Sequence, residues 1–530
     1  MAFLLHQLLS ESADRHPDRV AVEDDRGRLT YAELESLSSQ IAHYLRNRGI
    51  EPGDRVGLFL RKSIYGVAAL FGIQKAGAAY VPLDPQAPPL RAAYILQNCG
   101  VRVLVTEQEK LQRLPAEFLT QGALTGLLLV DSEAAANLEM AGTLPAATLA
   151  EIRSSQPIRH PAVPITDDYL AYILYTSGST GEPKGVMISH LNSLTFVNWA
   201  YDTFHVVSSD RVSNHAPFHF DLSVFDIFCT IKAGGTLSLV PDLIHPFPVE
   251  LARWISEKRL TIWYSVPSAL IQLVERGHLE RHDYRALRLV LFAGEVFPIK
   301  YVRRLVETLP HPEYYNLYGP TETNVCTYYK LKPEDLNSAR TEPVPIGVAC
   351  ENQEVVVLNE RLEPVPKGNE GELYVRSATV AKGYWGRLDD TAKVVVPNPL
   401  NRHFSSVLYR TGDIVRQLPS GEYQYVGRKD KMVKSRGYRI ELGEIEATLY
   451  AHPAVREAAV IAVPDDQVGA RLKAYVVADS NLARSELEKF CRDHLPRYMM
   501  PESMEFRSSL PRTSNGKVDI HALEKGSVAT

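Results

Sequence analysis

Residues 175–186 read Tyr-Thr-Ser-Gly-Ser-Thr-Gly-Glu-Pro-Lys-Gly-Val. Glycines allow a backbone to come close to a ligand, and successive N–H groups, hydroxyls and an ammonium group together bind phosphate oxygens. The apolar run Leu170–Leu174 comes directly before, so the sequence predicts a strand followed by a phosphate-binding loop. The loop differs from a Walker A loop, because Lys184 is followed by Gly185 where that loop has Ser or Thr. The alternative for such a composition is a flexible surface linker.

The composition indicates a multidomain globular protein. A chain of 530 residues is too long for one compact core, and 45% hydrophobic with 23% charged residues are ordinary values. The net charge of −5 gives no reason to expect nucleic acid or a membrane as partner. The five cysteines show no paired spacing, which fits a reducing compartment. Without a basic leader or an apolar stretch of membrane length, we expect a soluble cytoplasmic enzyme.

Alternating strand and helix patterns predict α/β layers in the first part of the chain. Strand-like runs are found at Val56–Leu60, Arg102–Val105 and Leu127–Val130, and helix-like stretches at Tyr31–Arg46 and Ile64–Lys75. Such alternation is typical of helices that cover largely parallel sheets.

The later part of the chain has a different pattern. Short alternating strands with Gly and Pro turns from Val355 to Val426 predict a small antiparallel or barrel-like unit. The basic, glycine-flanked segment Gly427–Ser435 predicts an exposed connection. Beyond it, two helices are expected at Gly443–Tyr450 and Ser485–His494, and two strands at Ala458–Val463 and Lys473–Val477. The predicted fold class is therefore α/β multidomain, with a small α+β unit at the carboxyl end.

The loop resembles the phosphate-binding motif of the adenylate-forming superfamily, which comprises acyl- and aryl-CoA ligases, luciferases and nonribosomal peptide adenylation domains. Further motifs of that family occur in its order: Leu29-Thr-Tyr-Ala-Glu-Leu34, Lys75-Ala-Gly-Ala-Ala-Tyr-Val-Pro-Leu-Asp84, Asn316-Leu-Tyr-Gly-Pro-Thr-Glu-Thr323, Gly371-Glu-Leu373, Gly383-Tyr-Trp385, Tyr409-Arg-Thr-Gly-Asp413, the run Gly427–Glu446 and Pro511-Arg-Thr-Ser-Asn-Gly-Lys517. The resemblance implies a large amino-terminal domain, residues 1–429, and a small mobile carboxy-terminal domain, residues 430–530, with a hinge at Asp430. It also implies ATP and Mg²⁺ as cofactors.

The resemblance assigns an ATP site to residues of several motifs. Phosphate contacts fall to Thr176, Ser177, Gly178, Ser179, Thr180, Gly181, Lys184 and the Thr321 hydroxyl, with Glu322 as the Mg²⁺ ligand. A single carboxylate suits Mg²⁺, which takes few protein ligands. The nucleoside contacts are Tyr318 against adenine, Asn316 on its amine, Gly294 and Glu295 on the opposite wall, and Asp413 and Arg428 at the ribose. Taken alone, Glu322 and Asp413 would indicate solvated turn residues.

Lys517 is the expected catalytic residue, because a mobile ammonium can bridge the substrate carboxylate, the α-phosphate and the ribose. By resemblance, the small domain turns about its hinge for the second half-reaction. This turn removes Lys517 and brings Lys434, Gly437 and Arg439 toward a thiol tunnel. Catalytic His219, in Phe-His-Phe, matches a gate beside the carboxylate, and the alternative is a packed core histidine.

Asp221, in Phe220-Asp-Leu-Ser223, distinguishes amino-acid activators from CoA ligases of fatty or aryl acids. In the former an aspartate at this position pairs with the substrate α-ammonium, which agrees with the high cost of an unpaired buried carboxylate. The alternative is a helix N-cap before Val224–Phe228. By motif alignment, the substrate pocket comprises Asp221, Leu222, Phe225, Tyr264, Leu291, Ala293, Leu317, Val325, Cys326 and Lys517.

This pocket predicts a small apolar amino acid. Between Asp221 and Lys517 it holds no charge and one strong polar group, the Tyr264 hydroxyl, so a polar side chain would lose its hydration without a partner. The set resembles the pocket of stand-alone prolyl-adenylating enzymes, and L-proline is the predicted substrate. Valine and pipecolate differ by about a methylene, a difference that discriminates weakly.

The expected reaction is ATP-dependent formation of aminoacyl-AMP, followed by transfer to the phosphopantetheine thiol of a separate carrier protein, since no carrier domain follows Lys517 in this sequence. One alternative is a CoA-forming acyl ligase. Another is a D-alanyl carrier-protein ligase, against which the aromatic-lined pocket argues. A third, from a different class, is a non-catalytic nucleotide-binding regulator on the same fold. Intact Lys517, Asp413, Glu322 and Lys184 argue against the regulator.

Overall fold

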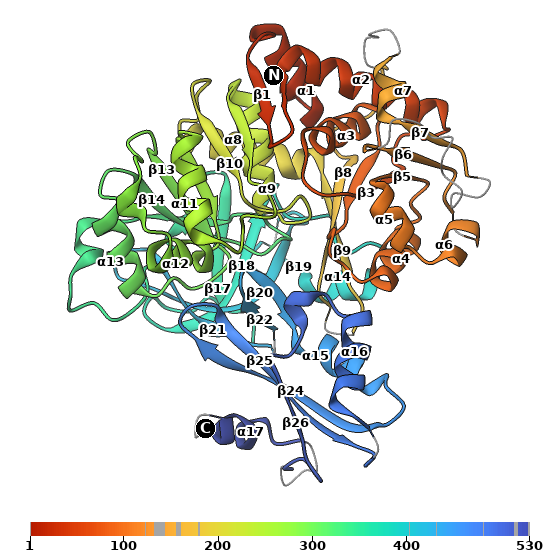
Figure 1. Cartoon of the computed structure of the whole chain (residues 1–530). Coiled ribbons are helices and arrows are strands. Elements are labelled where there is room, and N and C mark those ends of the chain that lie inside the picture. The colour runs from red at the N-terminus through yellow and green to blue at the C-terminus, as the bar shows by residue number, and fades with distance from the viewer. Residues whose placement is uncertain are drawn as a thin grey trace.

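Two large sheets dominate the fold (Figure 1). The structure is a computed structural model that describes residues 2–121, 123–131, 144–154, 161–178, 181–401, 403–430, 432–480, 482–512 and 518–527. The seven-stranded sheet has the order β7-β6-β5-β3-β4-β8-β9 and contains β3 (Arg55–Phe59), β4 (Ala79–Pro82), β5 (Val103–Thr106), β6 (Gly126–Leu129), β7 (Ala146–Thr148), β8 (Leu170–Thr176) and β9 (Lys184–Ser189). The nine-stranded sheet has the order β16-β15-β14-β13-β12-β10-β11-β1-β2 and contains β1 (Val20–Glu23), β2 (Arg28–Thr30), β10 (Arg211–Asn214), β11 (Thr236–Leu239), β12 (Ile262–Ser265), β13 (Leu289–Ala293), β14 (Glu313–Tyr318), β15 (Thr327–Lys330) and β16 (Val348–Ala349).

Both sheets are largely parallel, and one helix lies in the core that they share. Strands β3 to β8 pair in parallel and only β9 is antiparallel. Strands β10 to β14 are also parallel. Helix α3 (Ile64–Lys75) is apolar on every side, and each of its residues except Tyr65 is buried. A helix of this kind belongs in the interior, and the core around α3 takes side chains from both sheets.

Further helices of the large domain lie against the two sheets or, where they are short, within the shared core. They are α1 (Leu5–Arg15), α2 (Tyr31–Asn47), α4 (Pro89–Asn98), α5 (Gln108–Arg113), α6 (Ala116–Gln121), α7 (Leu149–Arg153), α8 (His190–Thr203), α9 (Leu222–Val224), α10 (Thr230–Ala233), α11 (Pro248–Glu257), α12 (Pro267–Arg276) and α13 (Ile299–Thr308). A π-helical turn, Phe225–Cys229, joins α9 to α10. Turns of this type occur frequently at functional sites.

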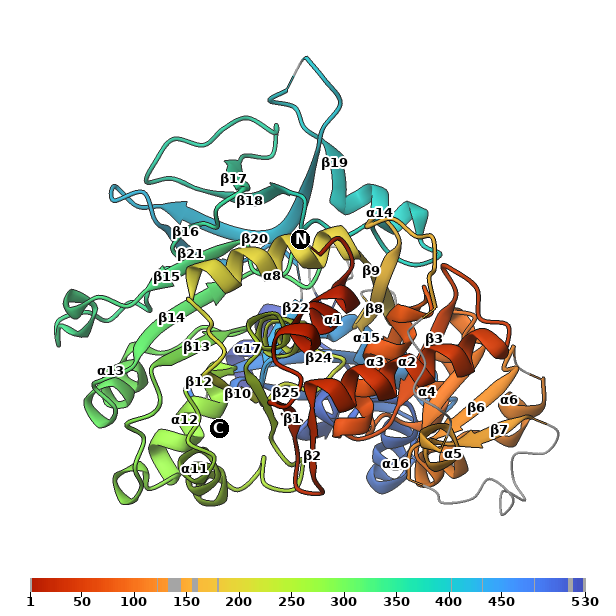
Figure 2. The same ribbon diagram turned by 90° about the horizontal axis from the view of Figure 1, so that it is seen from above.

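A third, antiparallel sheet follows. It has the order β17-β18-β20-β19 with β21 beside β20, and contains β17 (Gln353–Leu358), β18 (Glu370–Ser377), β19 (Val395–Pro397), β20 (Val407–Gln417) and β21 (Tyr423–Arg428), with α14 (Leu388–Val394) between β18 and β19. Seen from above, this sheet lies to one side of the two large sheets (Figure 2).

The described residues from Met432 onward form a small domain with its own core, below the large sheets in Figure 1. It consists of the hairpin β22 (Met432–Ser435) and β23 (Tyr438–Glu441), then α15 (Leu442–Tyr450), β24 (Val455–Asp465), β25 (Gly469–Ala478), α16 (Arg484–His494), β26 (Ser503–Phe506) and α17 (Ile520–Ser527). The structure thus confirms the α/β multidomain class with a small α+β unit at the end. Among the described helices, none has both the length and the apolar character that crossing a membrane requires.

One predicted segment differs from the structure. The sequence predicts an exposed connection over Gly427–Ser435, but its second half is strand β22, in which Met432 and Ser435 are buried. The local composition is basic and glycine-flanked, so it does not show that the hairpin packs against the large domain. The prediction of an exposed connection is therefore wrong for Met432–Ser435.

Replacement of Gly72 by alanine tests the close contact between α2 and α3. A Cβ atom at residue 72 would lie 2.7 Å from Ile41 Cγ2 and 2.9 Å from the Ser38 carbonyl oxygen. We expect Gly72→Ala to destabilise the protein by about 1–3 kcal/mol, visible as a lower Tm in thermal unfolding. Gly427→Ala is the control, because a Cβ there meets nothing within 4 Å. Equal Tm values for the two variants would contradict this account.

Candidate active site

A cavity of about 100 Å³ lies where strands of both large sheets end. Thr176 ends β8, Gly294 follows β13, and Gly319–Thr321 follows β14. The carboxyl ends of parallel strands are the usual place for ligands in such folds. Residues of the small domain close the other side of the cavity: Met432, Lys434, Gly437, Tyr438, Arg439 and Tyr498.

The predicted phosphate loop connects two antiparallel strands. The last residue pair of β8 and β9 is Thr176 with Lys184, so the loop is the tip of a hairpin. Gly178 has no room for a side chain, since a Cβ would lie 2.0 Å from the Glu182 carbonyl oxygen. The Lys184 ammonium lies 3.6 Å from Asp390 and 5.5 Å from the centre of the Tyr384 ring.

The donors of this loop meet the small domain. The Ser177 hydroxyl donates to the Arg439 carbonyl oxygen at 2.7 Å, and the Gly178 N–H donates to the Glu444 carboxylate at 3.1 Å. A Cβ at Gly181, whose φ is +88°, would meet Ala447 of α15 at 2.8 Å. Ser179 and Thr180 lie outside the described residues.

Asp221 is half-buried on the cavity wall and does not cap a helix. It is the residue before α9, but its side chain makes no capping hydrogen bond. Burial raises the pKa of Asp221, while a hydrogen bond from Thr321 and the charge of Lys434 act in the opposite direction. In the described part of the chain, no cation lies within ion-pair distance of this carboxylate. The N-cap alternative therefore lacks its defining contact.

The predicted substrate pocket divides into two layers. Asp221, Leu222, Tyr264, Ala293 and Val325 line the cavity. The structure places the other four described pocket residues behind this wall, at most 1% exposed: Phe225, Leu291, Leu317 and Cys326. Phe225 nevertheless supports the wall, because its ring packs edge-on against Tyr264 with 5.5 Å between the ring centres. Lys517 lies outside the described residues.

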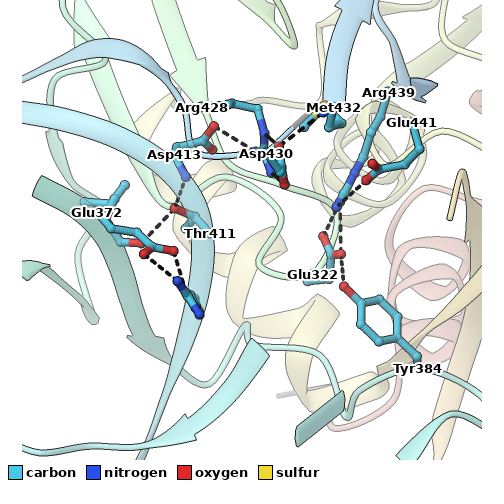
Figure 3. A network of polar contacts seen from close by, with 12 residues as sticks. Glu322, Glu372, Tyr384, Thr411, Asp413, Arg428, Asp430, Met432, Arg439 and Glu441 are labelled. Atoms are coloured by element: carbon cyan, nitrogen blue, oxygen red, sulfur yellow. Dashed lines mark hydrogen bonds and ion pairs between the residues drawn. The ribbon is translucent and has the colours of Figure 1, made fainter. Parts of the chain in front are cut away.

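Asp413 and Arg428, the residues predicted to hold the ribose, belong to a hydrogen-bonded network (Figure 3). Asp413 is 2% exposed, accepts from Arg428 at 2.8 Å and also accepts from the Tyr318 hydroxyl. Arg428 donates in addition to Asp430, at 2.7 Å from both its Nε and its Nη2. The Lys434 ammonium lies over the Tyr318 ring, 5.9 Å from its centre. Asp413 and Arg428 line the cavity.

Asn316 and Glu295, also predicted to contact the nucleoside, bond to protein groups away from the cavity surface in this structure. The Asn316 amide donates to the Pro345 carbonyl oxygen at 2.9 Å and is not on the cavity surface. The Glu295 carboxylate accepts from the backbone N–H groups of Ser268, at 2.9 Å, and Gly437, at 2.6 Å. Glu295 therefore joins the two domains here, whereas its neighbour Gly294 lines the cavity.

Glu322 is a buried carboxylate with a cation on it (Figure 3). Arg439 Nη1 donates to both of its oxygens at 3.0 Å, and the Tyr384 hydroxyl donates at 2.6 Å. Burial alone would raise the pKa of Glu322, but the Arg439 charge and the Tyr384 bond hold it below the ordinary value. No group of three or more His, Cys, Asp or Glu residues within the described ranges could hold a metal ion. A lone carboxylate that attracts a cation fits Mg²⁺ bound mainly by the phosphates of a nucleotide.

His219 lines the cavity beside Phe220. Its Nε2 atom is buried and has no hydrogen-bond partner among the described residues. Burial lowers the pKa of His219, so the ring is neutral near pH 7. The structure therefore places this histidine at the site, with one nitrogen available, instead of in the core.

Several residues at the site were not assigned from the sequence. Asn324 lines the cavity and has a positive φ of 53°, which is uncommon outside glycine. Tyr384 and Glu444 belong to the family motifs Gly383–Trp385 and Gly427–Glu446, but a motif does not show that Tyr384 contacts Glu322 or that Glu444 contacts Gly178. Arg91 of α4 forms an ion pair with Glu444, and no motif around Arg91 indicates this contact.

The chain matches known proteins over nearly its whole length. Residues 9–385 match the AMP-binding enzyme family and residues 444–517 its C-terminal domain. An L-proline–[L-prolyl-carrier protein] ligase of Pseudomonas fluorescens is 39% identical, covering 98% of this chain and 99% of that protein. A ligase of the same name from Streptomyces coelicolor is 38% identical, with 93% and 91% covered. The chain also matches tyrocidine synthase 3 of Brevibacillus parabrevis at 38% identity, covering 98% of this chain and 8% of that protein.

Solved structures show the same fold. The adenylation domain AlmE of Vibrio cholerae, in complex with glycyl-adenosine-5′-phosphate, has a TM-score of 0.85 at 25% identity and covers 100% of this chain and 98% of its own. An artificially fused adenylation–PCP di-domain from Klebsiella oxytoca has a TM-score of 0.79 at 25% identity, covering 99% and 96%. Because the family match covers most of the sequence and relatives of similar length align almost end to end, this chain belongs to the AMP-binding, adenylate-forming enzyme family.

Proposed function

We propose that this enzyme activates L-proline with ATP, in the presence of Mg²⁺, and transfers the prolyl group to the phosphopantetheine thiol of a separate carrier protein. The observation that carries the proposal is Asp221, a half-buried carboxylate without an ion-pair partner among the described residues, on a small cavity that Leu222, Ala293 and Val325 also line. The imino nitrogen of proline is charged and would supply the missing partner. Two relatives of similar length, at 38–39% identity, are L-proline–[L-prolyl-carrier protein] ligases.

The first half-reaction joins the amino acid to AMP. A carboxylate oxygen of proline attacks the α-phosphorus of ATP, and pyrophosphate leaves with the electrons of the broken P–O bond. We assign the triphosphate to the loop Thr176–Lys184 and to Thr321, and the metal to Glu322. Lys517 is the proposed catalytic residue, since an ammonium stabilises the charge that develops between carboxylate and phosphate.

We assign the nucleoside to the other end of the cavity. Tyr318, Asn316, Gly294 and Glu295 would surround the adenine, and Asp413 with Arg428 would hold the ribose. The Asn316 amide and the Glu295 carboxylate bond to protein groups in this structure, so both side chains would exchange these partners when ATP binds.

The second half-reaction moves the prolyl group to sulfur. The thiol gives up its proton to solvent or to a base at the site. Its sulfur attacks the carbonyl carbon of prolyl-AMP, and AMP leaves with the electron pair of the broken C–O bond. His219 has a free, neutral nitrogen for this purpose. With Lys434, Gly437 and Arg439 on the cavity, the orientation of the small domain suits this second step. We place the domain boundary at residues 429/430 and the hinge at Asp430.

Amino-acid-dependent ATP–pyrophosphate exchange tests the proposal. The panel contains L-proline, D-proline, pipecolate, valine, alanine and simple fatty or aryl acids. We expect the highest exchange activity with L-proline. Amino acids that differ from it by one methylene should have a kcat/KM lower by about 10- to 200-fold. Exchange with an acid that has no amine would overturn the assignment of Asp221 and favour a CoA-forming ligase. No exchange with any acid would favour a non-catalytic nucleotide-binding protein.

Replacement of Asp221 by asparagine tests the amine site directly. We expect Asp221→Asn to lower kcat/KM for proline by a factor that corresponds to about 2–5 kcal/mol of lost transition-state binding, since it removes one partner of a buried charge pair. The KM for ATP should change little. The matched control is Asp226→Asn. Asp226 is fully buried, accepts from Asn214 at 3.0 Å and does not line the cavity, so the same substitution there measures the cost of altering a buried carboxyl group away from the substrate. Equal losses in both variants would contradict a specific role for Asp221.

A further inference from the structure

Side chains of the small domain occupy the positions that the proposed function gives to metal and phosphate. Arg439 of β23 places a guanidinium on both oxygens of Glu322, the proposed metal ligand. Glu322 is 2% exposed, so few solvent molecules can share this carboxylate. A cation from the small domain therefore stands where the metal would be bound.

At the predicted phosphate loop, a carboxylate of the small domain takes the place that the proposed function gives to a phosphate group. The Glu444 carboxylate of α15 accepts from the Gly178 N–H at 3.1 Å, a backbone donor of the kind that phosphate oxygens take up. Arg91 of α4 pairs with the same carboxylate, which is 1% exposed. The Ser177 hydroxyl is also engaged, with the Arg439 carbonyl oxygen as acceptor. An anion of the small domain therefore lies on the loop that would hold the triphosphate.

We propose that Arg439 and Glu444 are positioning residues for the transfer step, which hold the small domain in this orientation by replacing the metal on Glu322 and a phosphate on the loop. The inference rests on the proposed function, since the roles of Glu322 and the loop come from there. It adds a consequence: magnesium pyrophosphate and this orientation compete for the same groups. Pyrophosphate must leave before the domain settles, and added magnesium pyrophosphate turns the domain away.

Binding linkage makes this competition measurable. If magnesium pyrophosphate disfavours this orientation, the orientation disfavours magnesium pyrophosphate by the same factor. A substitution that weakens the contacts of Arg439 or Glu444 should therefore allow magnesium pyrophosphate to change the domain orientation at a lower concentration. A contact between the domains that is remote from the phosphate groups should have a smaller effect. Lys300 and Asp466 supply one, an exposed ion pair between α13 and the turn after β24.

The test measures the domain orientation by fluorescence energy transfer between two dyes. Glu280→Cys on the large domain and Glu486→Cys on the small domain give labelling sites that are 68% and 61% exposed in the wild-type side chains. The five native cysteines are buried, so labelling is selective. Magnesium pyrophosphate is titrated into the labelled protein without amino acid. Magnesium alone and pyrophosphate with a chelator are separate arms.

We expect magnesium pyrophosphate to change the transfer efficiency, with a smaller change in either separate arm. In Arg439→Gln and Glu444→Gln the midpoint concentration of magnesium pyrophosphate should fall by about tenfold, within the usual range of coupling between sites. The midpoint of Arg439→Lys should lie between that of Arg439→Gln and that of the unsubstituted labelled protein. Asp466→Asn should stay within about twofold of the unsubstituted labelled protein, because an exposed pair contributes little. Unchanged circular dichroism would show that the variants are folded.

Two results would overturn the inference. One is a transfer efficiency that does not respond to magnesium pyrophosphate. The other is a midpoint in Arg439→Gln and Glu444→Gln equal to that of Asp466→Asn. Failure of the proposed function is measured separately, as the absence of amino-acid-dependent exchange. Either of the two results in a protein that does show exchange would overturn this inference alone.

Discussion

The ion pair between Arg439 and Glu322 determines which side chains complete the site. It joins the cavity-lining Arg439 of the small domain to a buried carboxylate of the large domain, which also accepts from the Tyr384 hydroxyl. Because Arg439 lies in the hairpin β22–β23, the same contact brings Met432, Lys434 and Tyr438 onto the cavity surface. If Glu322 binds the metal, as proposed, the metal and Arg439 compete for one carboxylate, which would tie the arrangement of the domains to what is bound.

The two large sheets provide the fixed part of the site. The ends of β8, β13 and β14 supply the phosphate loop, the wall at Gly294 and the segment that carries Thr321 and Glu322. These strands are anchored in a core that both sheets share through α3. In the proposed function, this half of the site stays in place while the small domain completes the cavity differently for each of the two reactions.

Local patterns predicted the elements well, because amphipathic and alternating periodicities are properties of the segments themselves. Ile64–Lys75 coincides with α3, and Tyr31–Arg46 ends one residue short of α2. Contacts between distant segments were beyond such patterns. Lys75 is an example: it is 1% exposed, pairs with Glu35 at 2.7 Å, and has its pKa lowered to about 8 by burial. Nothing next to it in the sequence indicates this partner.

The same limit applies to the site. The family motifs named Glu322, Asp413 and Asp221. The structure places Asp413 and Asp221 on the cavity and Glu322 behind it, bonded to the cavity-lining Arg439. Motif alignment does not show how far a residue lies from the cavity surface. It therefore could not distinguish Tyr264, which lines the cavity, from Phe225, which packs behind it. It also could not show that Glu295 would bond to Gly437, since that contact depends on where the small domain lies. The roles of these residues in catalysis stay predictions.

Loading of a carrier protein tests the central claim most directly. The enzyme is incubated with ATP, Mg²⁺, L-proline and a phosphopantetheinylated peptidyl carrier protein, and the intact mass of the carrier is measured. We predict a mass gain of one prolyl group, absent from the carrier that lacks phosphopantetheine and lost on treatment with hydroxylamine, which cleaves thioesters. Acylation of free coenzyme A without any gain on the carrier would contradict the account.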